Sequence, residues 1–138
     1  MYWLSVLLNR FRSRTSDAND LSIERLQELQ LLVRSLSGSV LEVEDPTSVR
    51  DVPWSTKDLY NLRDLADHVS PRSQQLANAA INVLQTMEPL IPNPASATPG
   101  SPERARYREL HTVAASILDD LSVEVSLIAK HRGFGQSG

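Results

Sequence analysis

The sequence of 138 residues contains no cysteine. This absence excludes disulfides, thiolate metal sites, iron–sulfur clusters and cysteine nucleophiles, so the fold must be stabilised by packing. A chain without cysteine suits a reducing compartment. We therefore expect a cytoplasmic protein, with a membrane-peripheral location as the alternative.

Glycine and histidine are also scarce. The five glycines form no GxGxxG or P-loop pattern, which leaves nucleotide binding without a motif. The three histidines, His68, His111 and His131, lie in different segments and form no HExxH motif. No nucleophile is paired with a base at a recognisable spacing. The sequence therefore predicts a non-enzymatic protein without catalytic residues, cofactor or metal.

Long apolar runs and excess positive charge are missing as well. No apolar run approaches the ~20 residues that cross a bilayer as a helix. The net charge is −3, whereas a general nucleic-acid binder usually presents a strongly basic face. We therefore expect no membrane span and no chain built mainly for nucleic-acid binding.

The residues that are present favour one globular domain, because 41% are hydrophobic and 22% are charged. From Leu21, apolar residues recur every three or four positions, as on one face of a helix. Asp20 or Ser22 can cap its start. Gly38 predicts a kink, or a stop and restart before Pro46. The expected apolar face comprises Leu26, Leu29, Val33, Leu36, Val40 and Val43.

Two shorter helices are expected in the middle of the chain. One begins at Ser55, whose side chain can accept a hydrogen bond from the backbone near Asp58. The next begins at Ser70 and Pro71, because serine caps helices and proline is tolerated at their first position. Its apolar residues continue to about Glu88.

A proline-rich crossover and a long helix complete the chain. Residues 89–101 favour extended, polyproline-like backbone. Ser101 and Pro102 repeat the capping device, and a long helix then runs to the basic residues before Gly133. Its expected apolar face comprises Tyr107, Leu110, Ala114, Ile117, Leu121, Val125 and Ile128.

These patterns predict an all-α fold, a bundle of four main helices plus a short N-terminal helical segment. The expected division is an apolar and basic segment at 1–14, one bundle domain over 20–133 and a tail at 134–138. Within the domain, the linkers are 44–55 and 89–101.

The N-terminal segment combines large apolar side chains with arginines: Trp3, Leu7 and Phe11, with Arg10, Arg12 and Arg14. One interpretation is a helix that docks on the bundle or on a partner protein. The other is an interfacial anchor, with the apolar residues among lipid headgroups and the arginines on anionic lipid. We favour docking, because a short isolated helix holds a membrane weakly.

The helix expected from Ser70 to about Glu88 carries no charged residue between Arg72 and Glu88. Depletion of charge is typical of interface cores, which makes this face a candidate for contact with a partner or another subunit. An uncharged surface in contact with solvent is the alternative interpretation. The candidate residues on its polar side are Gln75, Asn78, Asn82 and Gln85.

Arg104 and Arg108 share one face of the last helix and, with the N-terminal arginines, could contact phosphate or lipid. Glu103 and Glu109 dilute their field, and no aromatic residues are interleaved for base stacking. Nucleic-acid binding is therefore the least favoured of the binding hypotheses.

Two smaller patterns have simpler explanations than a site. Asp64 and His68 could face one metal ion, but two ligands are too few and a solvated helix face is favoured. Asp119, Asp120 and Glu124 form a cluster that we interpret as surface charge.

Three Ser/Thr-Pro steps resemble sites of proline-directed phosphorylation, yet Ser70 and Ser101 are explained as helix caps. Only Thr98 lacks that explanation.

The sequence thus predicts a structural or adaptor protein that acts through protein–protein interaction, by self-association or as a subunit of a larger assembly. A peripheral membrane protein anchored by its N-terminal segment is the main alternative. An accessory protein that binds nucleic acid follows, and no small-molecule substrate is inferred.

Overall fold

The computed structural model describes residues 14–45, 51–91 and 93–131, with side chains from Ile23 onward. Four α-helices and two short 3-10 helices occupy these ranges, which contain no strand. The predicted all-α class is therefore confirmed. The elements are α2 (Arg14–Glu42), α3 (Thr56–Asp67), α4 (Pro71–Met87), η1 (Glu88–Leu90), η2 (Pro94–Ala97) and α5 (Pro102–His131).

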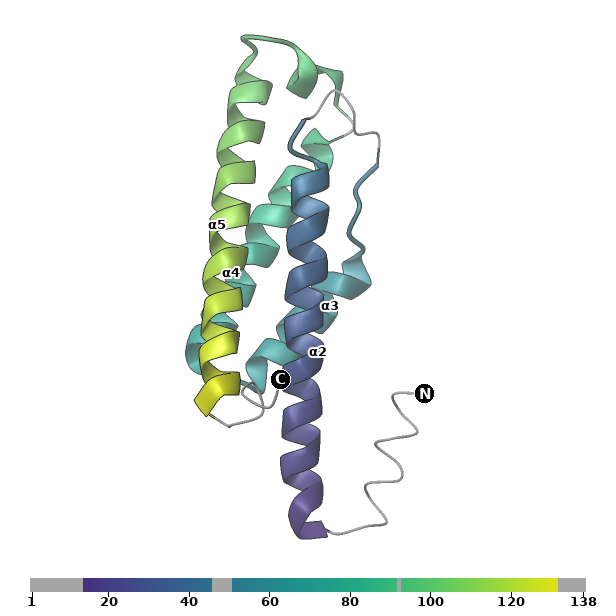
Figure 1. Ribbon diagram of the computed structural model, residues 1–138. Helices are drawn as coiled ribbons and strands as arrows, with labels where there is room; N and C mark the ends of the chain where they lie inside the picture. Colours follow the sequence, from purple (N-terminus) through teal and green to yellow (C-terminus); the bar gives the residue numbers. More distant parts are fainter. Residues whose placement is uncertain (1–13, 46–50, 92, 132–138) are drawn as a thin grey trace.

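The helices pack around one apolar core (Figure 1). Helices α2 and α5 lie side by side and antiparallel, α4 packs on α5, and α3 packs on both α2 and α4. The 3-10 helix η2 lies against the start of α5. Each helix buries one stripe of side chains, because apolar residues spaced by three or four positions share a face.

Helix α2 buries the face that its sequence pattern predicts, from Leu26 to Val43. Its predicted start is wrong, because the helix begins at Arg14 and both Asp20 and Ser22 lie inside it. The predicted interruption at Gly38 is also wrong. One glycine costs a helix only ~1 kcal/mol relative to alanine, and buried neighbours on both sides hold the backbone helical.

Serine caps begin the other helices, as predicted. The Ser55 hydroxyl accepts from the Asp58 N–H at 3.0 Å, and the Asp58 carboxylate accepts from the Ser55 N–H at 3.1 Å. Ser70 accepts from the Ser73 N–H and Ser101 from the Arg104 N–H, each at 3.0 Å. These bonds satisfy N–H groups that have no partner within their own helix.

The crossover differs from the extended backbone that its prolines predict. It contains η1 and η2, because the φ angle of proline also suits the first position of a 3-10 turn. The Asn93 side chain accepts from the Ala95 N–H at 3.0 Å and starts η2, while buried Ile91 and Ser96 hold the segment against the core. Gly100, at φ +79°, then turns the chain towards α5.

Residues 51–55, the described end of the first linker before α3, form neither helix nor strand. Trp54 is nevertheless buried, and its indole N–H donates to Glu88 Oε2 at 3.1 Å. The linker is therefore attached to the end of α4 through one aromatic side chain.

Helix α5 buries a stripe that is slightly rotated from the predicted one. Tyr107, Ala114, Leu121 and Val125 are buried as predicted, together with Leu118 and Ala129. Leu110, Ile117 and Ile128 are half-buried. Neighbouring apolar residues such as Ile117 and Leu118 fit the same period, and only contact with α2 and α4 decides which one points inward.

Two side chains of α5 contact backbone carbonyls at the C-terminal end of α2, one in its last turn and one at the residue that follows the helix. The Tyr107 hydroxyl donates to the Val43 carbonyl, and His111 Nε2 lies 2.8 Å from the Val40 carbonyl oxygen. The last carbonyls of a helix lack a following helical turn to bond to, so a neighbouring helix can supply donors. The Val40 carbonyl also accepts from the Val43 N–H at 3.2 Å. The end of α2 is thus attached to the beginning of α5.

We predict that Tyr107→Phe lowers the free energy of unfolding by ~1–3 kcal/mol, because it removes the donor from the Val43 carbonyl in a buried setting. Urea denaturation at pH 7 measures the difference. Tyr60→Phe is the matched control, since Tyr60 is 68% exposed and its loss of a hydroxyl should change stability little. Equal effects of the two variants would contradict the assignment.

Tyr107 should also make the free energy of unfolding depend on pH. Burial, with a smaller contribution from Asp45, raises the pKa of Tyr107 to about 12, against roughly 10 in an unfolded chain. The folded state therefore holds this proton more tightly. Its contribution to stability is complete below pH 10 and is lost as pH rises to 12. The stability difference between wild type and Tyr107→Phe should shrink across that window, and a constant difference would contradict the prediction.

Candidate partner-binding site

The polar face of α4 points away from the core. The buried residues Ala77, Ala80, Leu84 and Met87 fix the rotation of the helix about its axis. The four candidate residues, Gln75, Asn78, Asn82 and Gln85, are consequently all exposed. This face carries amide groups and no formal charge, so a partner could cover it without dehydrating an ion.

A groove with a volume of about 270 Å³ lies between α3 and α4. Buried Leu59 and half-buried Ile81 form its apolar part, and Tyr60, Arg63 and Gln85 line it with exposed side chains. Gln85 belongs both to the groove and to the uncharged face of α4. The groove and that face therefore form one continuous surface, which we call the α3/α4 surface.

Tyr60 and Arg63 were not among the residues that the sequence pattern selected. Tyr60 is 68% exposed, which is unusual for a large aromatic side chain. Tyrosine and arginine are enriched among the residues that contribute most to protein–protein binding. A signal existed in the sequence, because Tyr60 falls outside the face formed by Leu59, Leu62 and Ala66. The pattern within α3 does not show, however, that Tyr60 lies next to α4.

A second groove, of about 330 Å³, lies between α2 and α5. Val33 and Val125 are buried at its base, while Arg34 and Asp119 bring exposed charges of both signs to it. A partner would have to dehydrate these charges. The groove of the α3/α4 surface has the smaller volume and brings one charge, Arg63, instead of two. It contains an exposed aromatic residue and adjoins a face without charge, so the α3/α4 surface is the better candidate for a protein partner.

The arginines predicted to contact phosphate or lipid are only partly covered by the structure. Arg104 is half-buried, and its Nη1 donates to the Ala97 carbonyl at 3.0 Å, whereas Arg108 is exposed. Arg10, Arg12 and the side chain of Arg14 lie outside the described residues. So do Trp3, Leu7 and Phe11. Convergence of the two arginine groups, and docking of the N-terminal segment, stay predictions.

The Asp64 and His68 pair is explained within its own helix. His68 Nδ1 lies 2.8 Å from the backbone oxygen of Asp64, at the end of α3. Among the described residues, no group of three histidine or acidic side chains is arranged to hold a metal ion. In the same ranges, no helix combines the length and the apolar character of a membrane span.

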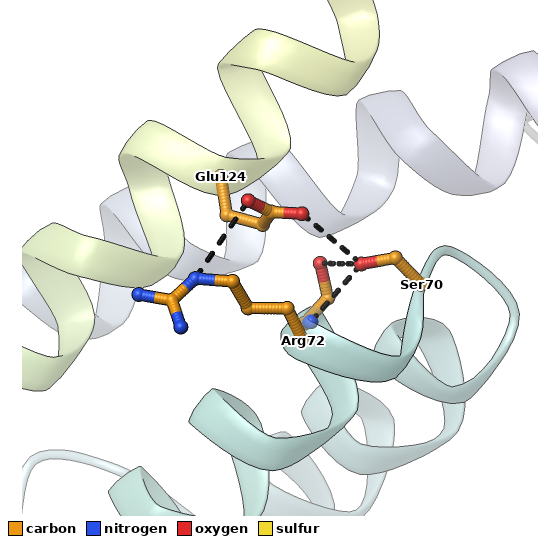
Figure 2. A network of polar contacts seen from close by, with 4 residues as sticks. Ser70, Arg72 and Glu124 are labelled. Atoms are coloured by element: carbon orange, nitrogen blue, oxygen red, sulfur yellow. Dashed lines mark hydrogen bonds and ion pairs between the residues drawn. The ribbon is translucent and has the colours of Figure 1, made fainter.

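Glu124 was predicted to be part of a cluster of surface charges, and for this residue the prediction is wrong. Asp119 and Asp120 are exposed, but only 20% of the Glu124 side chain is accessible. Figure 2 shows its carboxylate between α5 and the start of α4, with Oε1 at 3.9 Å from Arg72 Nε and Oε2 at 3.3 Å from Ser70 Oγ. A carboxylate at this position also interacts favourably with the positive end of the α4 dipole.

The hydroxyl groups of Ser70 and Ser73 form a short chain of hydrogen bonds to Glu124 where α4 meets α5 (Figure 2). Ser70 Oγ lies 2.8 Å from Ser73 Oγ, and buried Ser73 has no access to solvent. One hydroxyl has one proton, so both contacts are satisfied when Ser73 donates to Ser70 and Ser70 donates to Glu124. The network therefore fixes the start of α4, the helix that carries most of the candidate site.

We predict that Glu124→Ala lowers the free energy of unfolding by roughly 1–2 kcal/mol, because it removes a carboxylate that receives polar contacts from α4. Asp120→Ala, on an exposed position of the same helix, should change stability by less than about 0.5 kcal/mol. A double-mutant cycle with Ser70→Ala tests the contact itself. Coupling of at least about 0.5 kcal/mol is expected, and additive effects would contradict the network.

Comparison with known proteins adds no assignment: the chain matches no protein-family model, no characterised protein and no solved structure. The function must therefore be argued from the residues and their arrangement.

Proposed function

We propose that this chain is a non-enzymatic structural or adaptor protein that binds another protein, or a second copy of itself, through the α3/α4 surface. The observation that carries the proposal is the exposed Tyr60 beside a face of α4 without charge. In the finer form of this proposal, the four helices act as a bundle to which the N-terminal segment adds a further helix.

The energetics of covering the surface favour a protein partner. Burying an aromatic ring yields a large hydrophobic contribution, and the tyrosine hydroxyl still offers a hydrogen bond at the edge of a contact. Gln75, Asn78 and Asn82 can exchange water for amide or backbone groups without the cost of dehydrating an ion. Arg63 can pair with a carboxylate of the partner in a bidentate manner.

The surface is also held in place before any partner arrives. The buried stripe of α4, its serine cap and the contact with Glu124 fix one side, while the capping box of Ser55 and Asp58 fixes the start of α3. A surface that is ordered in the free protein loses less conformational entropy on binding. This suits an adaptor that contributes a rigid helical face to an assembly.

We predict that Asn78→Lys combined with Asn82→Glu abolishes association while leaving the free energy of unfolding nearly unchanged. Both positions are exposed, so the charges cost little in the free chain, but in a contact they lose hydration. The matched control is Thr112→Lys with Ser116→Glu, which places the same charges at the same spacing on exposed positions of α5. Light scattering over a concentration series and comparative pull-downs measure association.

Two outcomes distinguish an interface on the α3/α4 surface from a surface in contact with solvent. Loss of association in the α4 variant, with the α5 control intact, supports the proposal. Tyr60→Ala should weaken the same association by roughly ten-fold or more, as expected of a residue that anchors an interface. If the α4 variant and Tyr60→Ala both associate like the wild type, the α3/α4 surface is a solvent surface.

We predict for the N-terminal segment that removal of residues 1–14 lowers the melting temperature, because Trp3, Leu7 and Phe11 would no longer bury apolar surface against protein. Under this proposal, neither the full chain nor the shortened chain floats with vesicles of anionic lipid. Flotation of the full chain that disappears at high salt and on truncation would favour the peripheral membrane alternative instead.

A further inference from the structure

The chain has three Ser/Thr-Pro steps, and their hydroxyl groups are in different states. Ser70 caps α4, accepts from the Ser73 N–H and contacts Glu124. Ser101 caps α5, accepts from the Arg104 N–H and donates to the Ala95 carbonyl. Both hydroxyl groups are half-buried parts of helix starts, so modification of either one would remove a cap.

Thr98 lies in the turn between η2 and α5 and has a different environment. Its side chain is exposed, and its hydroxyl makes a single described contact, donating to the Pro94 carbonyl at 3.2 Å. The residue is extended, at φ −79° and ψ 120°, as expected for a position before proline. Its backbone N–H donates to the Ala95 carbonyl and its C=O accepts from the Ser101 N–H, so the residue is held by two turns. Opening these turns lets the exposed hydroxyl enter the active site of another enzyme without unfolding an α-helix.

The guanidinium of Arg104 is held next to this position. Arg104 projects from the first turn of α5, and its Nη1 donates to the Ala97 carbonyl at 3.0 Å, which belongs to the peptide bond preceding Thr98. Arginine carries five N–H donors, so one bond to a carbonyl leaves others for an anion. Arg108 stands one turn further along α5, whereas Glu103 adds one opposing charge.

We propose that Thr98 is a phosphorylation site of the proline-directed type and that Arg104 binds the phosphate. The Thr98 oxygen attacks the γ-phosphorus of ATP in the active site of a protein kinase. The new O–P bond forms as the bond to the β-phosphate oxygen breaks and ADP leaves, and the hydroxyl proton passes to the kinase base. The phosphate group of the product carries a charge of about −1.5 to −2 at neutral pH and has three acceptor oxygens.

The modification would change contacts at one corner of the molecule. Phosphorylation removes the proton that Thr98 donates to Pro94, and it places a dianion beside an arginine and near the positive end of the α5 dipole. Arginine and phosphate form short, bidentate hydrogen bonds. The link between η2 and α5 should therefore become stronger. This inference is independent of the proposed α3/α4 surface.

The first test asks which of the three Ser/Thr-Pro hydroxyl groups is phosphorylated. The full chain is incubated with ATP and a proline-directed protein kinase that phosphorylates a standard peptide, and the product is mapped by mass spectrometry. We expect phosphate on Thr98 at a level at least ten-fold above Ser70 and Ser101. Thr98→Val and Pro99→Ala should each abolish it, while Ser101→Ala should not. No incorporation at Thr98, or equal incorporation at the three sites, would overturn the proposal.

The second test is the role of Arg104. Phosphorylated wild-type protein should melt a few degrees above the unmodified protein, and the shift should decrease in high salt. In Arg104→Gln the shift on phosphorylation should vanish, and in the control Arg106→Gln, at an exposed position, it should persist. Each shift is measured within one variant, so a change in basal stability cancels. A shift that is unaltered in Arg104→Gln would overturn the assignment of Arg104.

Discussion

The antiparallel packing of α5 on α2 is the contact on which the other elements depend (Figure 1). Leu26 to Val40 on α2, Val43 just beyond it, and Tyr107 to Ala129 on α5 supply about half of the buried residues. At one end, Tyr107 and His111 contact the carbonyls of Val43 and Val40 at the end of α2, which fixes how far α5 can shift along α2. Apolar stripes alone would let one helix shift along the other by about one turn, because a similar set of leucine and valine side chains would face the partner helix after the shift.

Polar contacts at both ends attach α4 to other parts of the chain. Glu124 connects α5 to the first residues of α4, and Glu88 receives the indole N–H of Trp54 just beyond the last turn of α4. Both ends of α4 are therefore attached to other parts of the chain. With no cysteine available for a covalent link, these contacts and the buried stripe decide how far α4 can move.

Charge is distributed in a way that separates two parts of the surface. Beyond Arg72 in its first turn, the exposed face of α4 has no charged side chain, while the start of α5 carries Arg104, Arg106 and Arg108. The first part suits a dry contact with protein, and the second suits contact with an anion. A phosphate at Thr98 would act on the second part and would leave the α3/α4 surface chemically unchanged.

Apart from the start and continuity of α2 and the two 3-10 helices, the sequence by itself determined the helices, most of their buried faces and the three serine caps. Periodicity and capping depend on residues within a few positions of one another. The sequence also indicated the uncharged face of α4. Tertiary structure decided that Leu118 points inward, that Glu124 is largely buried and that Tyr60 stands beside Gln85. Those properties depend on which helix lies next to which, and residues more than 50 positions apart must meet before a carboxylate such as Glu124 can contact Ser70.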